Sequence, residues 1–239
     1  MWETLTQKTM TKTKRAEEAL RRVQELYPRR WTPSGGDHFK SLIRTILSQN
    51  TNWRNEETAY RRLEESIGVT PRELSKASLS TISDAIRPAG MYNQRSKTIK
   101  NVAEKVLELY NGDLSAVVAK SYLEAREELM TLPGVGEKTA DVVLLFNAGK
   151  HVLPVDRHLA RIAKRLELVR DSADYDTIRL TFESATTPDK FLDTHIKLIQ
   201  FGRDVCRALN PKCTECPLND ICPYPKGPRK GLNSQNKQI

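Results

Sequence analysis

Apolar residues recur along most of the chain at the three- and four-residue spacing that places them on one face of an α-helix. Strand signals are almost absent: the only extended candidate is 152–155, where Pro154 would interrupt a hydrogen-bonded ladder. The pattern predicts an all-α chain. The expected helices lie over 14–27, after Asp37, before Gly68, after Thr70, between Gly90 and Asn111, after Ser121, and over 156–167, 175–185 and 189–203.

Short polar signals mark several of these helix ends. Thr70 supplies a capping hydroxyl, Pro71 suits the first turn, and Glu73 follows the cap by three residues. The segment 121–124 forms a second capping box, and Asn111-Gly112 is typical of a helix C-terminus. No repeat of fixed period is present, which argues against a solenoid.

The size and charge of the chain restrict the classes of function that it can have. A chain of 239 residues and 27.2 kDa suits one or two domains. Its 39 Lys and Arg exceed its 30 Asp and Glu, and the net charge of +9 favours a polyanionic partner, nucleic acid first. The longest apolar run, 142–146, is far shorter than the ~20 residues of a membrane span, and the N-terminus lacks a secretory signal's apolar core. We therefore expect an intracellular monomer with no membrane contact.

All four cysteines lie in one short stretch, at Cys206, Cys213, Cys216 and Cys222. A disulfide framework would be spread more widely and would need an oxidising compartment, so a metal site is the better interpretation. Four thiolates from one compact loop suit a cubane iron–sulfur cluster. A structural zinc is the alternative, although four-cysteine zinc sites more often use two separated Cys-x2-Cys pairs.

The segment 132–136, Leu-Pro-Gly-Val-Gly, lies between a helix that ends near Met130 and one that begins near Glu137. Its two glycines, Gly134 and Gly136, permit a tight turn and leave backbone N–H groups open beside a helix N-terminus, which favours anions. One interpretation is a phosphate contact through Gly134, Val135 and Gly136 that would hold a nucleic-acid backbone without reading its sequence. The other is a plain helical hairpin that needs glycine only for its bend.

The string LPGVGEKTAD at 132–141, followed by Val-Asp-Arg-His at 155–158, resembles the helix-hairpin-helix DNA glycosylases, specifically the endonuclease III family. The resemblance extends through 47–49, 90–93 and 201–203 and covers about residues 30 to 222. The cysteine spacing, x6, x2 and x5 in turn, matches the 4Fe-4S loop of that family and of its adenine glycosylase branch. The resemblance implies a 4Fe-4S cofactor and duplex DNA as the partner.

The resemblance implies that Lys138 and Asp156 are the catalytic pair. In the family the lysine amine attacks the sugar C1′, and the aspartate stabilises the cationic sugar. An ordinary lysine is protonated at neutral pH; the helix dipole would lower the pKa of Lys138 and a nearby Asp156 would raise it, so the net shift stays open. Without the resemblance, the sequence would predict a helix-surface residue for Lys138 and a helix N-cap for Asp156.

The resemblance also implies DNA contacts. Gln49 would enter the gap left by an extruded nucleotide, and Met91 would wedge from a second loop where relatives often carry leucine. The alternatives are a helix C-cap ligand for Gln49 and a buried methionine for Met91. His158 would contact a phosphate, or be a surface histidine. The cluster would hold a loop whose cations suit phosphates: Arg203, Arg207 and Lys212.

The implied fold has a six-helix domain at 31–149 and a cluster domain formed by 1–30 with 150–225, with the DNA cleft between them. The segment 226–239 is rich in Lys, Gly, Asn and Gln and lacks an apolar face, so we expect a flexible tail there. The implied function is a bifunctional glycosylase and AP lyase that removes damaged pyrimidines and cleaves 3′ to the abasic site. Alternatives are a mismatch-specific thymine or uracil glycosylase, an adenine glycosylase, and a DNA-binding iron–sulfur protein without catalysis.

Overall fold

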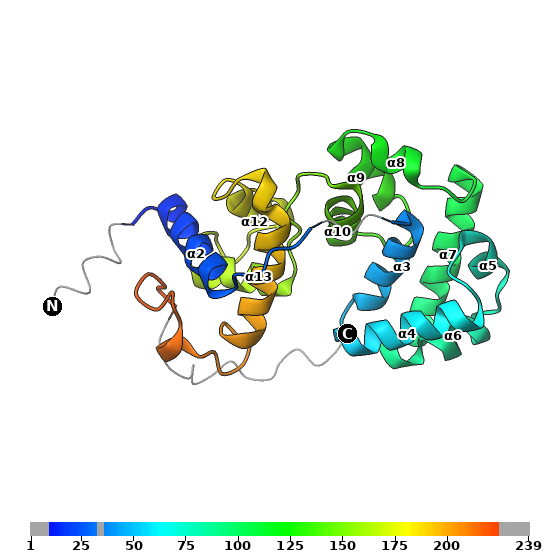
Figure 1. Ribbon diagram of the computed structural model, residues 1–239, viewed down its shortest axis with the longest axis horizontal. Coiled ribbons are helices and arrows are strands. Elements are labelled where there is room, and N and C mark those ends of the chain that lie inside the picture. Colours follow the sequence, from blue (N-terminus) through cyan, green and yellow to red (C-terminus); the bar gives the residue numbers. More distant parts are fainter. Residues whose placement is uncertain (1–9, 33–35, 225–239) are drawn as a thin grey trace. The chain divides into compact units, whose positions relative to one another are not determined.

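The computed structural model describes residues 10–32 and 36–224, and every regular element in those ranges is helical (Figure 1). The prediction of an all-α chain is confirmed. The predicted flexible tail, 226–239, lies outside the described residues. The chain divides into two compact units, one of Thr32–Pro154 and one of Met1–Trp31 with Val155–Ile239.

The unit formed by Thr32–Pro154 contains eight α-helices among its described residues, six of them eight residues or longer. Helix α7 runs through the unit and contacts α3, α5 and α6, while α10 contacts α3, α8 and α9. The elements are α3 (His38–Ser48), α4 (Trp53–Ser66), α5 (Pro71–Lys76), α6 (Leu79–Ile86), η1 (Arg87–Ala89), α7 (Tyr92–Tyr110), α8 (Ser115–Ala119), α9 (Tyr122–Met130) and α10 (Glu137–Ala148).

The second unit joins the N-terminal helix to the C-terminal part of the chain. Helix α2 packs on α12 and α13, and the Arg22 guanidinium donates to the Asp220 carboxylate and to the Pro217 carbonyl beside the cysteines. The N-terminal helix therefore supports the cysteine loop. The elements are α2 (Lys12–Leu26), α11 (Arg157–Arg165), α12 (Tyr175–Glu183), η2 (Pro188–Lys190), α13 (Phe191–Asp204) and η3 (Cys213–Glu215).

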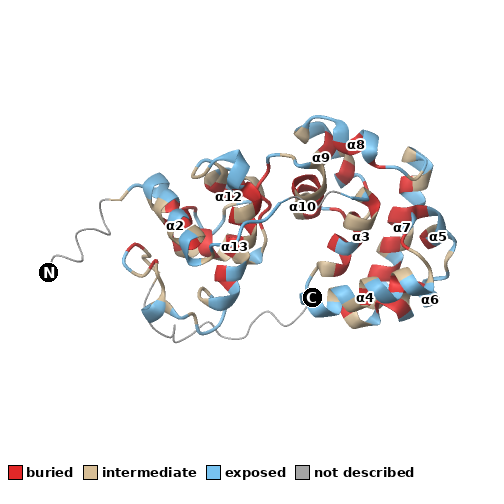
Figure 2. Cartoon of the chain, viewed as in Figure 1, coloured by how far each residue is buried: buried red, intermediate tan, exposed pale blue. Residues whose placement is uncertain are grey.

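The helices form where the sequence pattern places them because each has an apolar face to bury and a polar residue to begin it. Buried positions form the inner faces of the helices in each unit, as in the stripe Leu42, Ile43 and Ile46 of α3 (Figure 2). Asp37 and Thr70 cap α3 and α5 through their side chains as predicted. The predicted capping box of α9 is also present.

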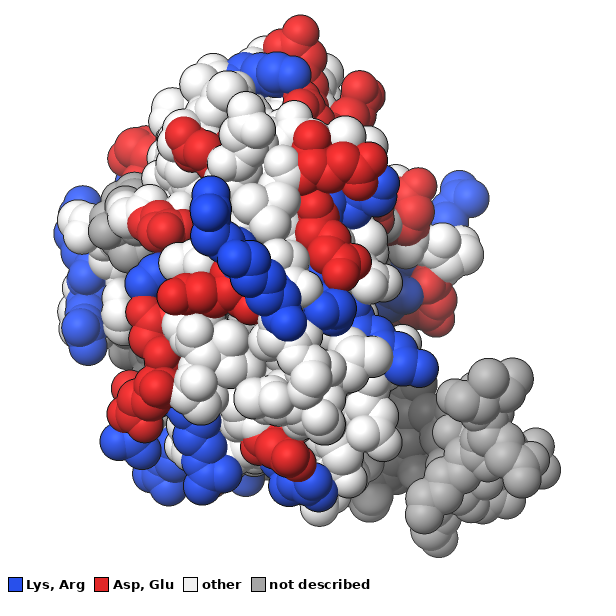
Figure 3. Space-filling view, turned by 90° about the vertical axis from the view of Figure 1, so that its right-hand side faces the viewer, with Lys and Arg blue, Asp and Glu red and all other residues white. Residues whose placement is uncertain are grey.

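Two short helices were not predicted. Helix α6 begins at a Ser78 cap and buries Ile82 and Ile86, whereas α8 spans only five residues, too few for a periodic stripe. The extended candidate 152–155 forms no strand; its residues are buried in a connection without regular structure. On the face drawn in Figure 3, basic and acidic side chains are interspersed, so the excess positive charge does not gather into one patch there.

Candidate active site and cysteine loop

The hairpin between α9 and α10 requires glycine at its first position. Gly134 has a φ of 72°, in the left-handed region, and a Cβ placed on it would lie 2.5 Å from Thr98 Cγ2 of α7. Val135 is buried, and its N–H donates to the Leu132 carbonyl at 3.1 Å. Val135 therefore anchors the turn from inside the unit, and its role as a DNA contact stays a prediction.

Gly136 differs from Gly134. It is the N-cap of α10 with an extended backbone, no side-chain cap, and no atom within 4 Å of an added Cβ. The packing of the described residues thus leaves its side-chain direction open. The first N–H groups of a helix have no partner within the helix, so the start of α10 presents donors and a positive dipole end to any anion that approaches.

Substitution of Gly134 by alanine is expected to destabilise the hairpin by about 1–2 kcal/mol from the left-handed backbone alone, with the clash against Thr98 in addition. Thermal unfolding measures the loss. The double variant Gly134→Ala with Thr98→Ala should recover the part due to the clash. Gly136→Ala, at an open position with ordinary φ, should unfold at a temperature close to that of the wild type. Equal losses of stability for Gly134→Ala and Gly136→Ala would contradict this geometry.

Lys138 lies half-buried in the first turn of α10, as predicted. That helix is fixed to α9 by a buried polar network that the sequence analysis missed. Asp141 is fully buried; its Oδ1 lies 3.2 Å from Arg126 Nε and accepts from the Tyr122 hydroxyl at 3.1 Å. The signal in the sequence was a carboxylate among the apolar residues of α10. The network holds α10, which carries Lys138, against α9.

Gln49 and Met91 both lie at sharp turns. Gln49 is the C-cap of α3, which agrees with one of its two interpretations, and its side-chain amide donates to Thr139 Oγ1 at 3.3 Å. Met91 begins α7 with a φ of 50°, and its side chain is 55% exposed. The buried-methionine alternative is therefore wrong. An exposed apolar side chain in a strained backbone conformation is available to a partner.

Asp156 caps α11, as predicted: its Oδ1 accepts from the N–H groups of His158 at 2.8 Å and Leu159 at 3.0 Å. These bonds hold the carboxylate at the helix N-terminus. Lys138 lies in the unit of Thr32–Pro154 and Asp156 in the other unit.

His158 is half-buried and tightly held. Burial lowers its pKa below the ordinary value, with the positive charge of Arg161 acting in the same direction. A Cβ added to Gly202 would lie 2.8 Å from His158 Cβ, so the residue at 202 must be small. His158 is therefore a packed residue and not a free surface histidine.

Two arginines of α11 link that helix to the cysteine loop, and the sequence analysis identified neither. Arg161 donates to the carbonyls of Gly202 at 2.8 Å and Cys206 at 2.9 Å. Arg165 donates to Cys206 Sγ at 3.4 Å and to the Arg207 carbonyl at 2.6 Å, and its guanidinium stacks on the Tyr224 ring. The helix that Asp156 caps is thus bonded directly to the first cysteine.

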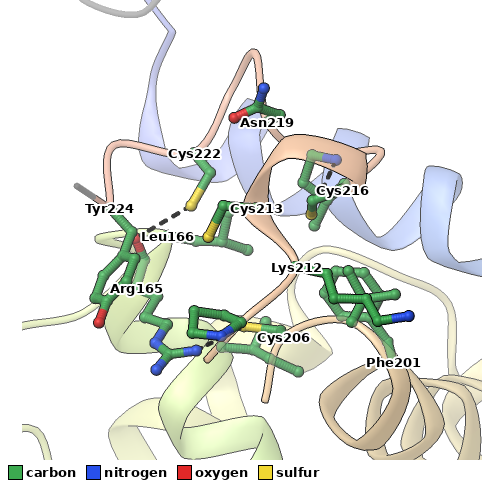
Figure 4. Close-up of a pocket in the computed structure, with 14 residues that line it drawn as sticks. Arg165, Leu166, Phe201, Cys206, Lys212, Cys213, Cys216, Asn219, Cys222 and Tyr224 are labelled. Atoms are coloured by element: carbon green, nitrogen blue, oxygen red, sulfur yellow. Dashed lines mark hydrogen bonds between the residues drawn. The ribbon is translucent and has the colours of Figure 1, made fainter. Parts of the chain in front are cut away.

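The four cysteines line one pocket with no disulfide among them (Figure 4). Burial raises the pKa of Cys216 to about 11 and also raises that of Cys222. Among residues 10–32 and 36–224, no three His, Cys, Asp or Glu side chains lie close enough together to hold a single metal ion. The thiols instead surround a pocket with apolar walls. Those walls include Ile162, Leu166, Phe201, Val205 and Leu218.

The donor set fits a cluster with one thiolate at each corner. Metal ligation requires thiolates, and a positive iron centre would favour the thiolate form of Cys216 and Cys222, whose pKa values burial raises. Hydrogen bonds to sulfur are already in place, from Arg165 to Cys206 and from the Leu218 N–H to Cys216 at 3.4 Å. Arg203, Arg207 and Lys212 are exposed around this loop, and their contact with DNA stays a prediction.

Comparison with known proteins gives the family. The model described as HhH-GPD superfamily base excision DNA repair protein matches residues 43–188, and the iron-sulfur binding domain of endonuclease III matches residues 206–222. Endonuclease III of Sulfolobus acidocaldarius is 35% identical over 187 residues, 78% of this chain and 82% of that protein. The chain belongs to the endonuclease III family. Its fold is the all-α fold of these glycosylases, and it carries their iron–sulfur binding domain.

Other members of the endonuclease III family match over nearly the whole chain. The protein of Thermotoga maritima is 34% identical over 215 residues, 90% of this chain and 95% of that one. A solved structure of a trapped endonuclease III–DNA covalent intermediate matches with a TM-score of 0.79 and 28% identity, covering 90% of this chain and 97% of that chain. The part of the chain that the structure describes includes no helix long and apolar enough to cross a bilayer.

Proposed function

We propose that this member of the endonuclease III family is a bifunctional DNA glycosylase and AP lyase that removes damaged pyrimidines from duplex DNA. The observation that carries the proposal is a lysine, Lys138, half-buried in the first turn of α10 directly after the glycine hairpin. Water-activating glycosylases do not need an amine at this point. The trapped covalent intermediate of an endonuclease III with DNA supports an attacking residue on this fold.

The reaction proceeds in two stages. The neutral Lys138 amine attacks C1′ of an extruded nucleotide, the bond from C1′ to the base breaks, and the base leaves with the bonding electrons and a proton. The resulting amine adduct opens to an imine between Nζ and C1′. Loss of a proton from C2′ then expels the 3′ phosphate by β-elimination, and water releases the lysine by hydrolysis of the imine.

Asp156 stabilises the positive charge that develops on the sugar and carries the lysine proton. Its two backbone hydrogen bonds fix the carboxylate before substrate arrives. The partner is duplex DNA that contains a damaged base or an abasic site. The hairpin N–H groups, Arg203, Arg207 and Lys212 contact phosphates, while Gln49 and Met91 fill the vacated stack.

Cys206, Cys213, Cys216 and Cys222 would hold a 4Fe-4S cluster, and its chemistry here would be to cross-link the loop through the four thiolates. Such cross-links would order a segment that has few apolar side chains of its own. Arg161 and Arg165 then connect the ordered loop to α11 and so to Asp156. The cluster supports the site without entering the reaction.

Borohydride trapping on abasic-site DNA tests the proposed function. Reduction of the imine should join protein and DNA permanently, and peptide mass spectrometry should find the adduct on Lys138. Base release from a panel of oxidised, deaminated and mismatched duplexes then distinguishes damaged pyrimidines from thymine, uracil or adenine in mismatches. A folded, metal-loaded protein that forms no adduct would be a DNA-binding protein or a water-activating glycosylase, and the proposal would fail.

Purified protein is expected to be coloured and to contain about four iron atoms per chain. Cys213→Ser should lose the colour and most of the iron, because one iron would lack its thiolate. Thr214→Ser, an exposed neighbour in the same loop, should retain both. Elemental analysis and visible absorption measure the result. Colourless wild-type protein with one zinc per chain would contradict the cluster assignment.

A further inference from the structure

Arg95 is a buried cation whose hydrogen bonds all go to backbone carbonyls. The residue lies in the first turn of α7 and is only 5% exposed. Its Nη1 donates to the carbonyls of Ala89 and Gly90, at 2.7 Å each, and its Nη2 donates to the carbonyl of Gln49. In the described part of the chain no carboxylate pairs with it. Burial accordingly lowers the pKa of Arg95.

A guanidinium in the interior is expensive, and an apolar side chain of similar volume would serve packing as well or better. What the guanidinium adds is geometry: its planar fork can bind several acceptors in fixed directions. The acceptors here belong to two separate segments. Ala89 and Gly90 form the turn before α7, while Gln49 ends α3, 46 residues before Arg95. Arg95 therefore joins two loops that nothing in the local sequence connects.

Both loops hold left-handed backbone where Arg95 binds them. Asn50, next to Gln49, has a φ of 53°, and Met91, next to Gly90, has a φ of 50°. Asparagine visits this region readily, whereas methionine adopts it only where its surroundings hold it there. Arg95 donates hydrogen bonds to the carbonyls of Gln49 and Gly90, the residues that precede Asn50 and Met91, and these bonds restrain both turns. They set the direction in which the chain leaves each turn, and thus where the side chains of Gln49 and Met91 stand.

The Gln49 side chain also contacts α10. The Gln49 side-chain amide donates to Thr139 Oγ1, and Thr139 follows Lys138 in α10. A set of hydrogen bonds thus runs from the turn before Met91 through Arg95 and Gln49 to Thr139, the residue beside the lysine.

We propose that Arg95 is a positioning residue that holds the Gln49 and Met91 loops at a fixed separation, so that both side chains enter the space left by an extruded nucleotide together. This inference rests on the proposed function. Arg95 touches neither DNA nor the reacting atoms; it acts through the two loops. Its loss should impair the steps that need extrusion from a paired duplex and spare the reaction at a sugar that is already unstacked.

The test compares Arg95→Met with wild type on two substrates. On a damaged duplex, Arg95→Met should release base about 10²-fold more slowly, the effect of a displacement near 1 Å. On a single-stranded abasic oligonucleotide, where no partner strand must be separated, borohydride trapping should stay within about twofold of wild type. Fluorescence of 2-aminopurine placed next to the lesion reports unstacking without any chemistry, and its increase on binding should be largely lost in Arg95→Met.

Two further variants separate positioning from stability. Arg95→Lys keeps the charge and reaches fewer carbonyls, so it should recover duplex activity in part. Arg179→Met removes another buried arginine, one that pairs with Asp176 and Glu183, and should lower thermal stability without changing the ratio of duplex to single-strand activity.

If Arg95→Met lost activity equally on both substrates, or kept the wild-type 2-aminopurine signal, the positioning role would be overturned. Should Arg95→Met fail to fold, Arg95→Lys carries the same comparison, and an unchanged substrate ratio there counts against the proposal. Failure of the proposed function is distinguishable, because wild-type protein would then form no adduct on the single-stranded substrate. The unstacking measurement still tests Arg95 in that case, and wild-type protein that unstacks nothing would reject this inference as well.

Discussion

Replacement of Lys138 by alanine is expected to abolish the borohydride adduct and to lower base release from a damaged duplex by at least about 10³-fold. That factor corresponds to about 4 kcal/mol of transition-state stabilisation. Alanine has no lone pair to attack C1′, so neither the glycosylase stage nor the imine-dependent cleavage can proceed through this residue. Because alanine is the strongest helix former, α10 should keep its stability. Single-turnover base release and thermal unfolding measure the two effects.

The matched control is Lys105→Ala. Lys105 is an exposed lysine of α7, paired with Glu108 at 2.8 Å, and its removal also takes one positive charge from the chain. Both variants should lose some DNA affinity through charge alone, and raised salt should reduce that difference. Only Lys138→Ala should lose the adduct. A Lys138→Ala protein that still forms the adduct would place the reacting amine elsewhere in the chain.

The local elements of this fold could be predicted because their causes lie within a few residues of one another. Asp37 and Thr70 each cap a helix by accepting from a backbone N–H three residues later, so both partners stand in the same short string. The apolar stripes have the same property, since a helical face repeats every three or four residues. The short α8 was missed because it has too few residues for a stripe.

The contacts that organise the candidate site join residues far apart in the sequence, unlike the local helix caps. Arg95 bonds to a carbonyl 46 residues away, and Arg161 to one 45 residues away. A backbone carbonyl is present at every residue, so no residue type in the sequence identifies the acceptor. Only the tertiary packing decides which carbonyl a buried arginine reaches. The motifs identified Lys138 and Asp156 as candidates, whereas the residues that support them had to come from the structure.

Asp156 has an observed structural task, the cap of α11, and a proposed chemical one. Its Oδ1 accepts both backbone hydrogen bonds at the start of α11. The other carboxylate oxygen is used in neither of these bonds. In the proposed reaction the negative charge faces the developing cation, while the cap needs only an acceptor oxygen. Asparagine supplies the acceptor without the charge, so the two tasks can be separated by substitution.

Asp156→Asn is therefore expected to keep the stability of the wild type within about 1 kcal/mol and to lower base release by about 10²- to 10³-fold. Asp156→Ala should lose the cap as well, at a cost of about 1 kcal/mol in the free energy of unfolding. Thermal unfolding and single-turnover base release measure the two quantities on the same preparations.

Asp174 provides the matched control because it caps α12 of the same unit through a bond from the Thr177 N–H at 2.8 Å. Asp174→Ala should destabilise the protein as much as Asp156→Ala does, but it should release base at the wild-type rate. If Asp156→Asn kept full activity, the charge at this position would have no part in the reaction. The carboxylate would then be a helix cap alone, and another group would have to stabilise the sugar cation.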